Sequence, residues 1–140
     1  MPYSVVLLGV FGLFPFFALP LLASLGLLSI GESARYFIQY SAVLLSFFGG
    51  IYWWDALQKN AFDKQIYIAM LPTIVGWLCL VFSGDYRVLG VLSLSYLAVL
   101  VYDKKSLVLS KEAIVSYITL RMGLTTIVVL CHAWLIFLLD

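Results

Sequence analysis

The chain has 140 residues, of which 64% are hydrophobic and 11% are charged, and its mean hydropathy is +1.10. An average soluble domain is roughly 45–50% apolar and about 25% charged. Because a soluble domain of this length still leaves roughly a third of its unfolded-chain surface in water, the composition excludes that class and predicts one integral membrane domain over residues 1–140. Eight Lys and Arg against seven Asp and Glu give a net charge of +1, so no basic surface for nucleic acid is expected.

The first apolar run covers residues 4–30. It is long enough to cross a bilayer core, which needs about 20 mostly apolar residues per helix. Pro15 and Pro20 remove backbone donors inside the run, so we expect them to kink it. The run has no basic N-terminal region and exceeds the roughly 7–15 apolar residues of a secretory signal peptide, so we expect a membrane span instead.

The second run covers residues 36–57 and carries a face of small side chains. Ala42, Ser46 and Gly50 recur at four-residue spacing, and such faces let helix backbones approach closely in lipid. We expect packing inside the chain rather than a homodimer seam, because four other helices compete for this face.

The end of this run reads Gly-Gly-Ile-Tyr-Trp-Trp-Asp. Gly49 and Gly50 permit a bend or a close helix contact. Trp53 and Trp54 are expected to anchor the helix at the membrane interface, with lining of a ligand pocket as the alternative. We expect Asp55 to be an interfacial carboxylate, either solvated or paired with a Lys, rather than a proton carrier or ligand group.

The third run covers residues 66–83 and the fourth covers residues 88–102. Pro72 and Gly76 predict a kinked, closely packed third helix. The fourth run is the shortest, so we expect it to lie shallow, to extend into the following loop, or to be accommodated by local thinning of the bilayer.

The fifth run covers residues 113–139 and carries a polar stripe. At about 100° per residue, Arg121, Thr125 and His132 fall within about 40° of one another, which is one side of a helix. This stripe stands out because the rest of the run is almost entirely apolar.

A buried Arg121 needs a partner, because a charge in the bilayer centre is costly. Asp103, which closes the fourth run on the same side of the membrane, is the simplest partner, and Asp55 is the competing acid. A structural ion pair between the fourth and fifth helices is favoured over an anion-binding or substrate-binding Arg121.

His132 is the sole histidine of the chain. We expect it to be hydrogen-bonded to a neighbouring helix rather than to act as a metal ligand or proton relay. No catalytic motif and no cluster of His and carboxylates at metal spacing is present, so neither a metal nor a cofactor is predicted. Cys79 and Cys131 both fall inside spans and indicate no disulfide.

The five runs predict an all-α fold, a polytopic bundle of five transmembrane helices. Only helices and closed barrels satisfy their backbone groups in hydrocarbon, and the runs lack the alternating polarity of barrel strands. With five spans, one face of the membrane carries five lysines and the other only two arginines, which predicts a cytoplasmic N-terminus and a C-terminus on the opposite side. The residues counted are Lys59, Lys64, Lys104, Lys105 and Lys111 against Arg35 and Arg87.

Four short segments in order resemble one family. They are SAVLLSFFGGIYW at 41–53, LPTIVGW at 71–77, YDKK at 102–105 and YITLRMGLT at 117–125. They resemble the small inner-membrane proteins grouped as domain of unknown function 3429, a family similar to the mitochondrial transmembrane protein 69.

The resemblance covers nearly the whole chain and implies a five-span membrane protein with no established reaction. Positions that match the family's recurring residues are Gly49, Gly50, Trp53, Pro72, Asp103 and Arg121. The family often has His or Arg where this chain has Tyr52, which argues against a role that needs a cation there.

The sequence predicts a protein of the bacterial cytoplasmic membrane and is compatible with two functions. The leading one is a non-enzymatic protein that acts by helix association with itself, as a homo-oligomer, or with a larger membrane complex. The alternative is a small permease or a lipid- or quinone-binding protein, with a polar cavity between the second, fourth and fifth helices. Asp55, Asp103, Arg121 and His132 would line that cavity. A membrane-embedded enzyme ranks last, because no nucleophile with its base is apparent.

Overall fold

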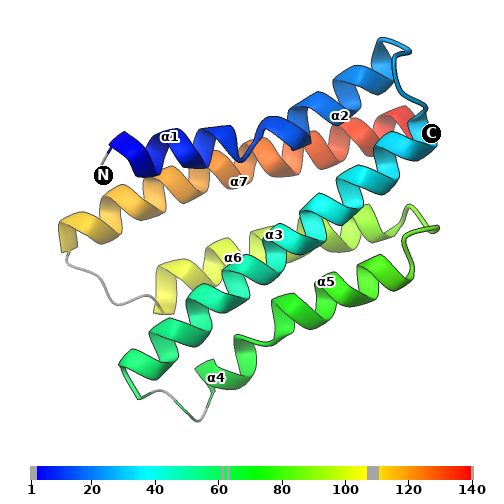
Figure 1. Cartoon of the computed structure of the whole chain (residues 1–140). Coiled ribbons are helices and arrows are strands. Elements are labelled where there is room, and N and C mark those ends of the chain that lie inside the picture. Colours follow the sequence, from blue (N-terminus) through cyan, green and yellow to red (C-terminus); the bar gives the residue numbers. More distant parts are fainter. Residues whose placement is uncertain (1–2, 61, 63, 107–110, 140) are drawn as a thin grey trace.

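A computed structural model describes residues 3–60, 62, 64–106 and 111–139, with side chains for all of these except 103–106 and 111–118 (Figure 1). These residues form helices and no strand, which confirms the all-α expectation. The helices are α1 (Tyr3–Phe11), α2 (Phe14–Ser24), α3 (Ile30–Gln58), α4 (Gln65–Ile68), α5 (Leu71–Val81), α6 (Val88–Ser106) and α7 (Lys111–Leu139).

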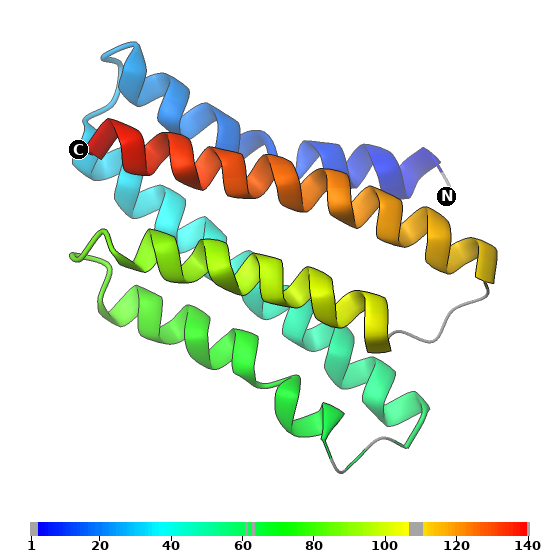
Figure 2. The same cartoon turned by 180° about the vertical axis from the view of Figure 1, so that it is seen from behind.

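The helices are arranged as five rods, because α1 runs on into α2 and α4 runs on into α5 (Figure 1). The chain reverses direction from one rod to the next. The long helix α3 is central: it packs against α2 on one side and α5 on the other, and it also contacts α6 and α7. Seen from behind, α7 lies next to both α2 and α6 (Figure 2).

The first expected run is two helices rather than one kinked helix. α1 ends at Phe11, and α2 begins at Phe14 with Pro15 in its first turn. Proline suits a first turn, because its ring presets φ and the N–H it lacks would have no helical partner. The hydroxyl of Tyr40 on α3 donates to the carbonyl of Gly12 at 2.7 Å and so holds the break. Pro20 lies inside α2 without ending it.

The helix α3 begins six residues before the expected run 36–57, so residues 31–35, which the predicted runs left as a break between two helices, are helical. Ser29 explains the difference, because its side chain accepts a hydrogen bond from the backbone N–H of Glu32 at 3.1 Å. A serine N-cap satisfies one of the donors that the first helical turn leaves without a backbone partner. The polar residues of 31–35 therefore form the first turns of α3.

The third run is broken as its proline predicts. The short α4 ends at Ile68, and α5 begins at Leu71 with Pro72 in its first turn. The fourth run extends into the following loop, since α6 continues to Ser106. With α7 beginning at Lys111, helix covers all of the expected loop at 103–112 apart from 107–110, which lie outside the described residues.

Two stretches of the described residues are long and apolar enough to cross a membrane, Tyr3–Ser24 and Thr119–Leu139. The apolar stretches Gln65–Val81 and Val88–Tyr102 are shorter. Large apolar side chains also cover the outside of the bundle, whereas a soluble monomer rarely exposes such patches beyond a few hundred Å². Examples that are more than half exposed are Phe14, Phe47, Trp54, Trp77, Leu94 and Phe137. Together these features indicate a membrane protein.

Part of the small-residue face of α3 packs inside the chain. A Cβ atom added at Gly49 would lie 2.7 Å from the carbonyl oxygen of Ala69, and one added at Gly76 would lie 2.8 Å from that of Ala42. Real Cβ atoms do not approach backbone oxygens so closely, so each glycine is required by a helix contact. Gly49 on α3 and Gly76 on α5 are two points of close backbone approach between α3 and the α4–α5 rod.

The remainder of this face points outward, so the expectation of internal packing is wrong there. Gly50 is exposed, and a Cβ atom added to it would meet nothing within 4 Å. Ser46 is half-buried and its hydroxyl donates to the carbonyl of Val43 in its own helix. Residues spaced four apart advance by about 1.1 helical turns, so each residue of the stripe is rotated slightly around α3 from the one before. The later residues of the stripe therefore no longer face α5.

Candidate ligand-binding pocket

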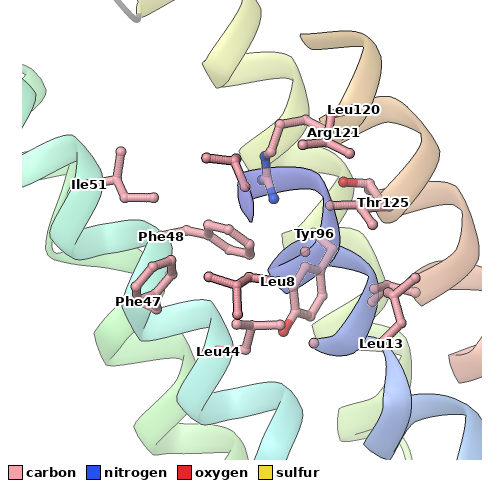
Figure 3. Close-up of a pocket in the computed structure, with 15 residues that line it drawn as sticks. Leu8, Leu13, Leu44, Phe47, Phe48, Ile51, Tyr96, Leu120, Arg121 and Thr125 are labelled. Carbon is pink, nitrogen blue, oxygen red and sulfur yellow. The ribbon is translucent and has the colours of Figure 1, made fainter. Parts of the chain in front are cut away.

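A cavity of about 460 Å³ lies between α1, α3, α6 and α7 (Figure 3). Its size and its mostly apolar wall are typical of small-molecule sites, which add a few polar groups to such a wall. The lining residues are Val5, Leu8, Gly9, Gly12, Leu13, Leu44, Phe47, Phe48, Ile51, Tyr96, Leu120, Arg121, Leu124, Thr125 and Val128. The polar side chains in this set are those of Tyr96, Arg121 and Thr125.

Arg121 lies in the wall on α7 with only 5% of its surface exposed. Its guanidinium carbon is 3.8 Å from the centroid of the Phe48 ring on α3. A guanidinium over an aromatic face gains electrostatic attraction, and the gain is larger where water is excluded. The contact directs the guanidinium across the cavity toward α3, as Figure 3 shows.

Thr125 follows one helical turn later on the same face of α7 and is 2% exposed. Its Oγ1 is buried and has no hydrogen-bond partner among the described residues. Other helix hydroxyls of the chain donate to the carbonyl four residues earlier; these are Ser24, Ser93, Ser95 and Thr126. Thr125 therefore places a hydroxyl that makes no described hydrogen bond in the wall of the cavity.

The outer wall of the cavity is the helix α1. None of its residues is buried, and it packs on α7 while α2, beyond the break, packs along α3. The pocket thus lies where α1 diverges from α3. A lightly packed wall of this kind can move with little loss of contact.

Tyr96 lies between the cavity and a second polar group, the pair Ser41 and His132. The Tyr96 hydroxyl donates to the Ser41 carbonyl at 2.6 Å. His132 Nδ1 lies 2.7 Å from the Val128 carbonyl, and its Nε2 lies 2.8 Å from Ser41 Oγ. A carbonyl only accepts, so Nδ1 donates, and in the neutral ring Nε2 accepts from the serine hydroxyl. The rings of Phe16 and Phe37 enclose the histidine.

The contact of Ser41 with His132 has the distances of a nucleophile with its base. Both residues are 0% exposed, and neither lines a described pocket. A reacting carbonyl cannot reach the hydroxyl, so the pair is a structural bridge between α3 and α7. This matches the expected hydrogen bond of His132 to a neighbouring helix.

Asp55, near the end of α3, is held by two neighbours. Lys59 Nζ lies 2.9 Å from its Oδ2, and Gln65 Nε2 donates to the same oxygen at 2.6 Å. The ion pair with Lys59 agrees with the expectation that Asp55 is an interfacial carboxylate, solvated or paired with a lysine. Trp53 and Trp54, the expected interface anchors, are both exposed beside it.

Asp85 and Arg87 form a separate ion pair in the turn between α5 and α6. Arg87 Nη2 lies 2.7 Å from Asp85 Oδ2, and the backbone N–H of Arg87 donates to Asp85 Oδ1 at 3.0 Å. These hydrogen bonds lower the pKa of Asp85 and raise the pKa of Arg87. The pair is exposed and belongs to the turn, away from the cavity.

The expected polar cavity differs from the observed one in place and character. We expected it between the second, fourth and fifth spans, whereas the first span also contributes a wall and most of the lining is apolar. Of the four candidate residues, Arg121 lines the cavity, while Asp55 and His132 lie elsewhere. The side chain of Asp103, and with it the expected pair with Arg121, lies outside the described residues.

Thr125 and Phe48 are the pocket residues whose roles the sequence did not reveal. The stripe on the fifth span contained Thr125, but the spacing did not show that its hydroxyl makes no bond to its own helix among the described residues. Phe48 is one of ten phenylalanines in the chain, and its contact with Arg121 joins residues 73 positions apart in sequence, by subtraction of their numbers.

Comparison with known proteins agrees with the resemblance noted in the sequence. A curated relative, transmembrane protein 69 of Xenopus tropicalis, is 32% identical over 107 residues, which are 73% of this chain and 42% of that protein. The chain thus matches less than half the length of this relative. No solved structure matches it significantly. The pattern that defines the family described as "Protein of unknown function (DUF3429)" matches residues 1–137, and the chain belongs to this family.

Proposed function

We propose that this chain is a five-span membrane protein that binds an amphiphilic molecule of the bilayer in the cavity between α1, α3, α6 and α7. The observation that carries the proposal is the cavity itself: an apolar volume of about 460 Å³ with two buried polar side chains, Arg121 and Thr125, in one wall. The buried Thr125 hydroxyl has no hydrogen-bond partner among the described residues, and burial of such a group is costly because it loses its hydration. A lipid or a quinone has the matching combination of a polar head and an apolar body.

The proposed topology has five crossings of the bacterial cytoplasmic membrane, with the N-terminus in the cytoplasm. The excess of lysine in alternate loops supports this orientation, because short loops rich in Lys and Arg stay in the cytoplasm. The name of the relative in Xenopus tropicalis and the two long apolar helical stretches support a membrane location. In this topology the shorter stretches cross as the α4–α5 and α6 rods, which pack beside α3 (Figure 1).

The experiment is mass spectrometry of the intact protein released from native membranes in mild detergent. We expect wild-type protein to retain a small apolar molecule, and Leu8→Trp to lose most of it, because Leu8 lines the cavity. Leu94→Trp is the matched control: both leucines are 69% exposed, but Leu94 lies on α6 away from the cavity. Absence of a retained molecule, or equal retention by both variants, would reject the proposal.

Association through α3 is a second candidate function, and one observation favours it. Gly50 and Ser46 leave an open patch on the outside of α3, flanked by the exposed Phe47. Small residues on a lipid-facing helix allow a second helix to approach closely. The partner would be another copy of the chain or a larger membrane complex.

Cysteine crosslinking in membranes tests this candidate. A homo-oligomer predicts that Ser46→Cys crosslinks to itself and that adding Gly50→Leu abolishes the crosslink. The open space at Gly50 means that this change leaves the monomer intact. If Ser46→Cys forms no crosslink, self-association through this face is rejected, and copurification would then have to supply a different partner.

A further inference from the structure

We propose that the occupant of this cavity is an acid-headed amphiphile, in which a carboxylate or phosphate group at the end of an aliphatic chain binds Arg121 and Thr125. The inference rests on the proposed function and deepens it by naming the ligand class. It also assigns a direction to the ligand, with the head closer to the membrane surface than the chain.

The first step is the chemistry of Arg121. A guanidinium is always protonated and carries five N–H donors in a planar fork that matches carboxylate and phosphate oxygens. Five donors allow it to bind a ligand oxygen while it also contacts a protein group. Arg121 is only 5% exposed and its surroundings are mostly apolar, and such surroundings strengthen an interaction with a negative charge more than one with a neutral carbonyl.

The second step is the position of Thr125. It lies four residues after Arg121, so both side chains emerge from one face of α7, and Figure 3 shows its oxygen on the same side as the guanidinium. The hydroxyl makes no bond to its own helix among the described residues. It can therefore donate to an acceptor that Arg121 also binds. Two converging donors suit an acid group, which offers several lone pairs on adjacent oxygens.

The third step is the depth of these two residues. Counted from residue 113, Arg121 is the ninth of the 27 residues in the apolar run 113–139, so it lies in the third of that run nearest the start of α7. From there to Val128, at the other end of the cavity, α7 rises about 10 Å. Leu13, Leu44 and Val128 line this deeper end and are apolar, and the Tyr96 hydroxyl there is bonded to the Ser41 carbonyl. The polar end of the cavity is therefore closer to the membrane surface than its apolar end, which is also how the head and chain of a membrane lipid are arranged.

The fourth step is access. The cavity lies between α1 and α3, and α1 has no buried residue to hold it in place. A molecule can pass sideways from the leaflet into this gap without leaving the membrane. The positive-inside count makes this the cytoplasmic leaflet, whose anionic lipids are attracted to lysine-rich loops.

The experiment measures binding of defined amphiphiles to delipidated protein in neutral detergent. Oleate, phosphatidylglycerol, phosphatidylcholine and a neutral quinone are added one at a time, and retention is followed by mass spectrometry of the intact protein. We expect at least one of the two acidic amphiphiles to bind about tenfold more tightly than both neutral ones, because a hydrogen bond to a charged group is worth more than a neutral one. Binding of oleate alone would indicate a free fatty acid, and binding of phosphatidylglycerol a phospholipid head group.

Two test variants and one control show whether Arg121 and Thr125 bind the acidic head group. Thr125→Val keeps the shape of the side chain and should weaken binding of the acidic amphiphile about tenfold, whereas Thr126→Val should leave it unchanged. Thr126 is the matched control, since its exposed hydroxyl is bonded to the Met122 carbonyl. Arg121→Lys keeps the charge, lacks the planar fork and should also weaken binding.

The outcomes separate the two proposals. If quinone or phosphatidylcholine binds as tightly as the acidic amphiphiles, or if Thr125→Val binds them like wild type, the acid-headed ligand is wrong and a cavity for amphiphiles remains. If nothing binds, the proposed function fails as well. Melting temperatures of each variant in the same detergent show whether a loss of binding reflects a loss of folding.

Discussion

Individual buried polar side chains link the helices of this bundle. In lipid the hydrophobic effect does not draw helices together, so close packing and hydrogen bonds between helices must do so. The bond between Ser41 and His132 joins α3 to α7, and the Tyr52 hydroxyl joins α3 to α6 by donating to the Val99 carbonyl at 2.7 Å. Each of these groups would be buried and unsatisfied if its partner were lost.

Ser41→Ala is expected to lower the free energy of unfolding by about 1 kcal/mol, because His132 Nε2 would then lack its donor in an apolar site. Titration with a denaturing detergent measures the change. Ser46→Ala serves as the control: its hydroxyl bonds within its own helix, so the expected change is less than about 0.5 kcal/mol. Equal effects for the two serines would contradict a structural bridge at Ser41.

At this scale the sequence indicated which side chains matter but not what they touch. Arg121 and His132 were recognisable, because an ionisable residue in an apolar helix is unusual. Their contacts with Phe48 and Ser41 depend on how α3 and α7 cross, and no local spacing encodes that crossing. The same holds for Thr125: its place in the polar stripe was recognisable, but the position of its hydroxyl in the cavity wall was not.

Adjacent glycines of α3 have opposite environments. Gly49 meets the backbone of the α4–α5 rod, whereas Gly50 faces open space. Successive residues in a helix point about 100° apart, so Gly49 can lie on the packed face of α3 while Gly50 lies on its outward face.

Gly49→Ala should therefore destabilise the fold by about 1–3 kcal/mol, because its Cβ atom would force α3 away from the Ala69 carbonyl. Gly50→Ala should instead stabilise the fold by up to about 1 kcal/mol, since alanine favours helix and nothing obstructs it. Thermal unfolding in detergent distinguishes the two signs. A destabilised Gly50→Ala, or a neutral Gly49→Ala, would contradict this packing of α3.

The elements followed from the sequence better than their ends did. Apolar run length predicted where helices lie. The kinks expected in the first and third runs are breaks between two helices, with Pro15 and Pro72 each in the first turn of the second helix. The polar segment at 31–35 was misread, because polarity alone does not distinguish a loop from a capped first turn. Ser29 followed three residues later by Glu32 was the signal that could have corrected it.

The whole molecule depends on lipid as its solvent. The hydrophobic composition predicted this. In the structure, large apolar side chains are exposed over the outside of the helices, which is unusual for a protein surrounded by water. The pocket could not be predicted in the same way, since its walls come from four elements spread over residues 5–128. The head-to-tail direction proposed for its ligand also depends on the order in which the chain crosses the membrane.

Labelling of single cysteines by a membrane-impermeant maleimide tests that order most directly. Lys59→Cys and Arg87→Cys are placed in the second and third interhelical connections, and the native Cys79 and Cys131 are buried, so wild-type protein is the unlabelled control. Five crossings from a cytoplasmic N-terminus predict that Arg87→Cys is labelled in intact cells and Lys59→Cys only in inside-out vesicles. Labelling of both positions from the same side would contradict the proposed topology, and with it the leaflet assigned to the ligand.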